Sequence, residues 1–318
     1  MRRVRRPFLW WLALLAVLMA WPLVASEYRV FQAGVIASTA IMALGLVIVT
    51  GVAGQVSLAQ AAFSAIGAYG AALLATKLGV PAYFGIPLAA ALAGVAGYGL
   101  GLASLRLGGH YLALVTMAMT AIVQVGLTHW ETLTGGALGL MVPPLTVAGK
   151  ELTSGFALYY VVVPVAFALF LGVSNLMASR LGRVFAALRQ SEVALQTLGI
   201  NVLHYKALAF ALSGALGAVG GGLQGLQTTF LDPHGFGIIE SVVLVAVIII
   251  GGFRSIPGAV LGSAVFVLIP ELLGGFQAYK GVVWAVLLLL MIVLFPGGLA
   301  GAGAALAARL RPNAGAAR

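Results

Sequence analysis

The sequence predicts an all-α membrane protein of about ten transmembrane helices, with both termini cytoplasmic. Apolar residues fill 62% of the 318 positions and charged residues only 8%, whereas soluble domains carry about 25% charged residues. Almost the whole chain divides into apolar runs close to the ~20 residues that cross a bilayer, separated by short polar breaks. Because no soluble domain fits between these runs, residues 1–318 are expected to form a single transmembrane domain.

The first apolar run follows a basic N-terminus and ends near Ser26, in a sequence that also matches a signal-peptidase site. The run is longer than the ~7–15 residues of a signal core. Trp10, Trp11 and Trp21 near its ends are typical of interfacial anchors, so we expect the helix to be retained. The expected helices lie near residues 7–25, 31–52, 57–76, 82–104, 110–127, 157–177, 207–227, 238–252, 257–273 and 281–297.

The positive charges orient the chain. With the N-terminus in the cytoplasm, only Arg29, Lys77, Lys150 and Lys280 of the 17 Lys and Arg residues fall in outer segments, and the other 13 lie inside. Positive loops stay on the cytoplasmic side, so topology explains the net charge of +10 without nucleic acid. The absence of cysteine excludes disulfides, thiolate chemistry and Cys-ligated metals.

Two longer polar connections interrupt the helices, at 128–156 outside and 178–206 inside. The outer one contains Gly135, Gly136 and a Pro-Pro pair, which predicts an ordered, turn-rich cap. The inner one has helically spaced apolar residues on both sides of a polar break at Ser191. This spacing predicts two short amphipathic helices. Such an element either lies in the lipid headgroup layer or docks a cytoplasmic partner, and the pattern leaves both open.

The motifs of several enzyme and carrier classes are missing. Neither a phosphate-loop sequence nor H-E-x-x-H occurs, so we expect no nucleotide site, no bound metal and no catalytic site in this chain. Ion-driven carriers commonly mark their path with intramembrane acidic residues, and here only Glu240 and Glu271 approach membrane depth. Backbone carbonyls can hold sodium at broken helices, so an ion-coupled secondary carrier remains the weaker alternative.

A polar stripe is the candidate solute path. Thr116, Thr120 and Gln124 recur every four residues and therefore share one helix face. Gln55 and Ser57 lie in another segment of low bulk and are expected to contribute polar groups to the same route. The alternative is that the Thr and Gln side chains form interhelical hydrogen bonds, worth about 0.6 kcal/mol on average.

A second stripe predicts close helix packing. Ser213, Gly217, Gly221 and Gly225 also repeat every four positions, a pattern that lets a neighbouring helix approach. Direct contact with the solute is the alternative. The segment 51–69 is similarly poor in bulky residues, and we expect it to be irregular or closely packed beside a cavity, where protein or water satisfies its backbone.

These residues together resemble the permease subunits of branched-chain amino acid ABC transporters, specifically the longer of the paired permeases. The inner stretch from Gly182 to Asn201 is similar to the cytoplasmic loop that engages the ATPases in that family. This chain departs from the family pattern at two positions: at Arg254, where the family usually has a small residue, and at His110. The resemblance covers most of the chain, through Gly54-Gln55-Val56-Ser57-Leu58, Phe63, Gly67-Ala68-Tyr69, Leu105 to Thr116, Leu133 to Gly136, Gly139 and Lys206 to Phe210.

The resemblance implies a multi-pass permease of the bacterial inner membrane. It would work with a second permease, two cytoplasmic ATPases that bind ATP and Mg²⁺, and an extracytoplasmic solute-binding protein, and would move branched-chain amino acids inward by alternating access. Urea or short amides are carried by near relatives, so the solute stays open, as does homo- or heterodimeric pairing of the permeases. The implied ATPase-coupling residues are Arg183, Glu192, Ala194 and Gly199.

Overall fold

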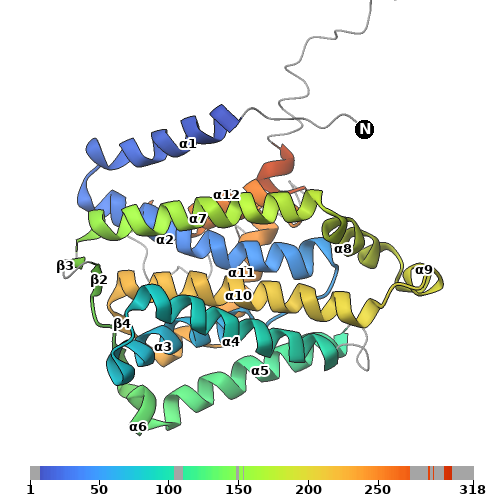
Figure 1. Ribbon diagram of the computed structural model, residues 1–318, viewed down its shortest axis with the longest axis horizontal. Helices are drawn as coiled ribbons and strands as arrows, with labels where there is room; N and C mark the ends of the chain where they lie inside the picture. Colours follow the sequence, from blue (N-terminus) through green and yellow to red (C-terminus); the bar gives the residue numbers. More distant parts are fainter. Residues whose placement is uncertain are drawn as a thin grey trace, which may run out of the picture.

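A computed structural model of the chain describes residues 8–103, 110–147, 150–152, 154–272, 286, 289 and 297–302. It is a bundle whose long helices run side by side (Figure 1). The regular elements are α1 (Phe8–Ala20), η1 (Trp21–Leu23), α2 (Glu27–Leu46), η2 (Val47–Val52), α3 (Gln60–Leu78), α4 (Ala82–Ala103), α5 (His110–His129), α6 (Glu131–Thr134), η3 (Gly136–Leu138), β1 (Leu140–Met141), β2 (Leu145–Val147), β3 (Lys150–Leu152), α7 (Gly155–Ala178), α8 (Arg180–Gln190), α9 (Glu192–Thr197), α10 (Val202–Thr228), β4 (Phe230–Leu231), η4 (Pro233–Phe236), α11 (Ile238–Gly251) and α12 (Ile256–Leu272).

The all-α membrane fold is confirmed. Six helices of the described chain are long and apolar enough to cross a membrane, namely α2 with η2, α3, α4, α5, α7 and α10. The shorter α11 and α12 change direction by 118° between them and form one broken span or a re-entrant pair. The 13 residues of α1 extend only about 20 Å. The predicted helix at 281–297 and both termini lie outside the described residues, so ten helices and cytoplasmic termini stay predictions.

Helix α10 lies at the centre of the bundle, where it packs against α2, α3 and α4. The contacts are close because small residues meet backbone. A Cβ atom on Gly214 would lie 2.5 Å from the carbonyl oxygen of Ala93 in α4, and one on Gly67 of α3 would collide with the backbone of Ala218. Without a hydrophobic force between helices in lipid, such backbone approach is how membrane helices gain packing energy.

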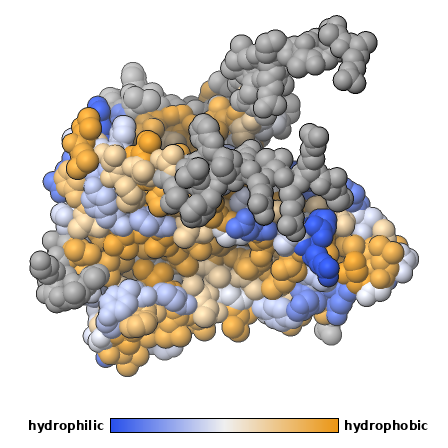
Figure 2. Space-filling model, turned by 45° about the horizontal axis from the view of Figure 1, so that its top comes forward, coloured by the Kyte–Doolittle hydropathy of each residue, from blue (hydrophilic) through white to orange (hydrophobic). Residues whose placement is uncertain are grey.

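The outer surface of the bundle is apolar. Large side chains on the outer faces of α4 and α5, such as Leu92, Val95 and Ile122, are exposed. Figure 2 shows apolar residues covering much of the visible face, with hydrophilic residues mainly toward the two ends of the long axis. This distribution suits helices whose outer faces meet lipid.

The two ends of the bundle differ. At one end, α8 and α9 project beyond the long helices; at the other lie α6 and the four short strands (Figure 1). We call these the α9 end and the cap end. At the cap end, β1 pairs antiparallel with β4, joining Leu140 to Leu231, and β2 pairs with β3. The expected turn-rich cap therefore ties the α5–α7 connection to the α10–α11 connection.

Candidate functional site

The α9 end carries the two short helices that the sequence predicts. The Ser191 hydroxyl caps α9 by accepting a hydrogen bond from the amide of Ala194 at 3.2 Å. After α9 the chain turns at Gly199, whose φ of +75° lies in the left-handed region that favours glycine. At the start of α8, Gly182 lies so close to the carbonyl of Met177 that a Cβ atom would collide with it.

Helix α9 presents apolar side chains outward at this polar end of the molecule. Val193 is 69% exposed and Leu198 is 75% exposed, and Ala194 is also exposed. Only Leu195 of this helix is buried. On α8, Arg183 is exposed too. Exposed apolar side chains on a short helix suit contact with either the lipid headgroup layer or another protein.

Glu192 at the start of α9 is bound to the transmembrane bundle. Its carboxylate lies 2.7 Å from the ammonium group of Lys206 in α10, whose side chain is only 6% exposed against 39% for Glu192. The Gln55 amide donates to the same carboxylate oxygen at 3.4 Å. The position of α9 is therefore linked both to α10 and to the segment that follows η2.

Arg189 joins α8 to two other elements. Its guanidinium donates to the backbone carbonyl of Gly51 in η2 and lies over the ring of Phe253, 5.7 Å from the ring centroid, in the turn between α11 and α12. A Cβ atom on Gly54, where φ is +74°, would lie 2.7 Å from Arg189 Cγ. The α8–α9 element thus contacts η2, α10 and the α11–α12 turn.

Between η2 and α3 the chain is not helical, as expected for this part of residues 51–69. Thr116 and Thr120 of α5 hold it: the amide of Leu58 donates to Thr116 Oγ1 at 3.0 Å, and Thr120 Oγ1 donates to the Leu58 carbonyl at 2.7 Å. Ser57 Oγ accepts from the amide of Ala59 at 3.4 Å. Non-helical backbone at membrane depth requires such partners, because lipid offers none.

This segment leads into the middle of the bundle before α3 begins. Gln60, the first residue of α3, donates to the carbonyl of Met42, ten residues before the end of η2, so it lies roughly 15 Å inside that end. The side-chain oxygen of Gln60, Oε1, accepts a hydrogen bond from Ser213 Oγ of α10 at 3.0 Å. Ser241 Oγ of α11 accepts from the Ala61 amide at 3.0 Å and satisfies a free N–H of the first turn of α3.

The predicted solute-path residues are only partly brought together. Gln55, Ser57, Thr116 and Thr120 surround Leu58, are buried and use their polar groups on the chain itself. Gln124 lies apart from them, toward the cap end, where its amide abuts Gly237. No measurement in the structure assigns these residues to a solute route, so that role stays a prediction.

The predicted glycine face of α10 is turned toward α3. A Cβ atom would lie 2.8 Å from Gln60 Nε2 at Gly217 and 2.6 Å from Ser64 Cα at Gly221. At Gly225 it would lie 3.1 Å from Leu231 of β4 and 3.5 Å from Ala68 of α3.

Several residues of this site escaped the sequence analysis. Arg189 was counted there only as an inner charge, Lys206 only as an inner charge and as part of the family pattern, and Gln60 and Ser241 were not singled out. The partners of Arg189, Gln60 and Ser241 lie far away along the chain, 153 residues for Gln60 and Ser213, which no local pattern shows. The sequence did contain a signal for Gln60, because it is a glutamine within a stretch of small residues. In the structure its side chain is fully buried.

The sequence of this chain is similar to the sequences of known membrane permeases. The family model described as branched-chain amino acid transport system, permease component, matches residues 29–296. The permease protein LivM of the high-affinity branched-chain amino acid transport system is 31% identical in Salmonella typhimurium, over 91% of this chain and 73% of the relative. LivM of Escherichia coli is 32% identical, over 90% of this chain and 73% of the relative. The Pseudomonas aeruginosa relative BraD is 27% identical, over 82% of this chain and 91% of the relative. No solved structure matches.

Proposed function

The chain belongs to the family of branched-chain amino acid transport system permease components, and we propose that it forms one membrane-spanning subunit of an ATP-driven importer for leucine, isoleucine and valine. It is a multi-pass permease of the bacterial inner membrane, a transport subunit and not an enzyme. The observation that carries the ATP-driven part of the proposal is α9, a short exposed helix that is bound through Glu192 to the buried Lys206.

Coupling to ATP requires contact, because the sequence has no phosphate loop of its own. We assign that contact to Arg183, Glu192, Ala194 and Gly199 in the α8–α9 element, within the cytoplasmic loop 178–206. The outward apolar side chains of α9 supply surface for an ATPase groove. Binding and release of ATP would close and open the ATPases and move α9 as a rigid body.

Movement of the α8–α9 element reaches the membrane interior through four contacts. Glu192 transmits it to Lys206 and Gln55, and Arg189 transmits it to η2 and the α11–α12 turn. The side chains of Thr116 and Thr120 hold the middle of the non-helical segment that follows. Such a segment can change its backbone angles at lower cost than a continuous helix, which suits alternating access.

The remaining parts of the machine are proposed from the relatives. The relatives LivM and LivH of Escherichia coli are both named as permease proteins of the high-affinity branched-chain amino acid transport system. We infer a second permease, two cytoplasmic ATPases that carry ATP and Mg²⁺, and an extracytoplasmic solute-binding protein. This chain then contributes one transmembrane domain, residues 1–318, with the outer connection 128–156 facing the binding protein, and binds no cofactor itself.

Gly199 offers the sharpest test of the coupling proposal. Among the described residues other than its two chain neighbours, no atom lies within 4 Å of a Cβ atom placed on Gly199, so only its positive φ restricts substitution there. Gly199→Val should strain the turn and misplace α9, whereas Gly199→Asn should be tolerated because asparagine enters the left-handed region more readily. We expect Gly199→Val to lose ATP-dependent leucine uptake and ATPase binding in proteoliposomes, with the subunit still in the membrane.

The same assay separates the alternatives. Leucine uptake that requires ATP, the ATPases and the loaded binding protein supports the importer. Uptake that follows a sodium or proton gradient without ATP would establish a secondary carrier, and transport of urea or short amides in place of leucine would reassign the solute. Normal coupled uptake by Gly199→Val would show that this loop does not join the ATPases.

A further inference from the structure

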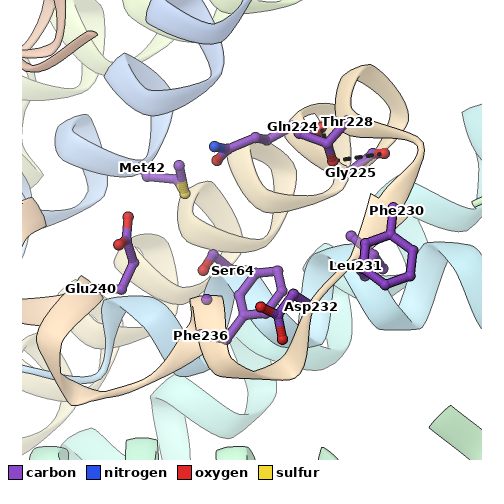
Figure 3. A pocket seen from close by; sticks show the side chains of 11 residues that line it. Met42, Ser64, Gln224, Gly225, Thr228, Phe230, Leu231, Asp232, Phe236 and Glu240 are labelled. Carbon is purple, nitrogen blue, oxygen red and sulfur yellow. Dashed lines mark hydrogen bonds between the residues drawn. The ribbon is translucent and has the colours of Figure 1, made fainter. Parts of the chain in front are cut away.

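A cavity of about 170 Å³ lies in the cap half of the bundle, where α2, α3, α10 and α11 meet. It is larger than the ~15 Å³ that one water needs. Its walls come from elements far apart in the sequence, including Met42 of α2, Ser64 of α3 and Glu240 of α11 (Figure 3). The residues that follow α10 form its rim, where Thr228 and Asp232 are exposed.

Two polar side chains extend into this space without a partner. In the part of the chain that the structure describes, the Glu240 carboxylate and the Gln224 amide make no hydrogen bond or ion pair, although both line the cavity (Figure 3). The other polar groups are occupied: Ser64 Oγ donates to the Ala61 carbonyl, and Asp232 accepts from the His234 amide. Glu240 belongs to α11, one half of the broken span, and an unpaired carboxylate in a membrane segment is costly and therefore indicates a functional site.

The rest of the wall is apolar. Met42 lies on one side, and Phe236 and Leu231 lie on the other. Phe236 is held in place by edge-to-face contact with Tyr69, with ring centroids 5.7 Å apart, and the Tyr69 hydroxyl donates to the Leu231 carbonyl at 3.1 Å. The cavity thus combines one unpaired carboxylate, one neutral amide and a preformed apolar surface, with the Asp232 carboxylate at its rim.

We propose that this cavity binds the amino acid during its passage through the permease. The Glu240 carboxylate accepts a hydrogen bond from the α-ammonium group, the Gln224 amide donates to the α-carboxylate, and the branched side chain contacts Met42 and Phe236. The assignment rests on the proposed importer function and extends it by a solute site. Recognition of the zwitterion then takes place in the cap half of the bundle, away from the segment around Leu58 that receives movement from α9.

The charge of the cavity can be measured without transport. Because the sequence contains no cysteine, Thr228→Cys at the rim gives a unique thiol in a transporter whose other subunits lack accessible cysteines. A cationic thiol reagent should react about threefold or more faster than an anionic one, and Glu240→Gln in the same background should reduce that preference. Leucine with its binding protein should slow the reaction at Thr228→Cys but not at the control Glu27→Cys, which is exposed at the start of α2 and outside the cavity.

The role of Glu240 in uptake needs a separate experiment with a matched control. Glu240→Gln keeps shape and removes charge, and we expect ATP-dependent leucine uptake to fall about tenfold, as for a lost charged hydrogen bond. Glu27→Gln removes an exposed carboxylate at the start of α2, outside both the cavity and the connection 128–156, and should stay within about twofold. The thermal midpoint and the subunit composition of the complex are measured alongside.

The outcomes distinguish this assignment from the proposed function. Absence of leucine uptake by the unaltered complex overturns the importer proposal and the site with it. Unaltered leucine uptake by Glu240→Gln, or equal reaction of the two reagents at Thr228→Cys, overturns the site alone. A lower thermal midpoint or lost subunits in Glu240→Gln would also overturn it, because the carboxylate lies in the first turn of α11 and would then serve helix stability or assembly.

Discussion

At the scale of single residues, the contact between Lys206 and Glu192 determines how α9 can act. The Lys206 side chain is 6% exposed, so its ammonium group has lost most of its water and depends on the carboxylate 2.7 Å away. Removing one partner of a buried pair leaves a charge without compensation. The pair therefore fixes α9 to the start of α10 more firmly than a surface ion pair would.

Reversal of this pair should show the effect. Glu192→Lys places two cations together and should lower the free energy of unfolding by about 2 kcal/mol, less than the value for a fully buried pair, because Glu192 is 39% exposed. Adding Lys206→Glu restores opposite charges and should recover most of the thermal midpoint and of leucine uptake. Equal stability of the single variant and the parent protein would show that the contact carries no energy.

Thr120 provides the second residue-scale prediction. Thr120→Val keeps the shape but leaves the Leu58 carbonyl without its hydroxyl donor, so it should lower the free energy of unfolding by about 1–3 kcal/mol, whereas Thr120→Ser should not. Thermal unfolding of the purified complex measures this difference. If both variants are as stable as the parent but alter the concentration dependence of leucine uptake, the hydroxyl belongs to the solute path predicted from the stripe.

At the scale of elements, the spacing of residues along the sequence predicted individual helices and a packed face, but not which helices pack together. Repeats of small residues every four positions in α10 indicated a closely packed face, and capping residues indicated α8 and α9. The partner of that glycine face, α3, could not be predicted, because hydropathy places the start of a helix only from its local composition. Gln60 begins α3 deep in the bundle because Met42 and Ser213 bind its side-chain amide and Ser241 accepts from the Ala61 amide of the first turn.

Substitution at Gly221 should separate packing from helix propensity. A Cβ atom there would collide with the backbone of Ser64, which cannot rotate away, so Gly221→Ala should destabilise the protein by about 1–3 kcal/mol. In the control Gly99→Ala of α4, no atom of another described segment lies within 4 Å of the new methyl group, and the variant should be neutral or slightly stabilising. A normal thermal midpoint for Gly221→Ala would mean that α10 and α3 are farther apart than described.

At the scale of the whole molecule, hydropathy predicted the helices because lipid forces each spanning segment to satisfy its own backbone. Nine of the ten predicted helices coincide with helices in the described residues. Hydropathy placed breaks near residues 52 and 252, but it gave neither the path from η2 to the start of α3 inside the bundle nor the 118° turn between α11 and α12. Both depend on side chains from distant segments, such as Thr116 at Leu58 and Arg189 at Phe253. The sequence singled out Glu240 as an acidic residue within an apolar run, but the cavity that it lines could be recognised only from the fold.

The orientation of the whole bundle gives the last prediction. The 27 residues of α10 extend about 40 Å, more than the ~30 Å hydrocarbon layer, so the α9 end and the cap end must lie on opposite sides of a membrane. Leu138 is 88% exposed at the cap end and Gln196 is exposed on α9. In this cysteine-free chain, Leu138→Cys should react with an impermeant thiol reagent in right-side-out vesicles, and Gln196→Cys only in inside-out vesicles. Reaction of both from one side would overturn the spanning arrangement, and an exchange of sides would place α9 away from the ATPases and so refute the coupling mechanism.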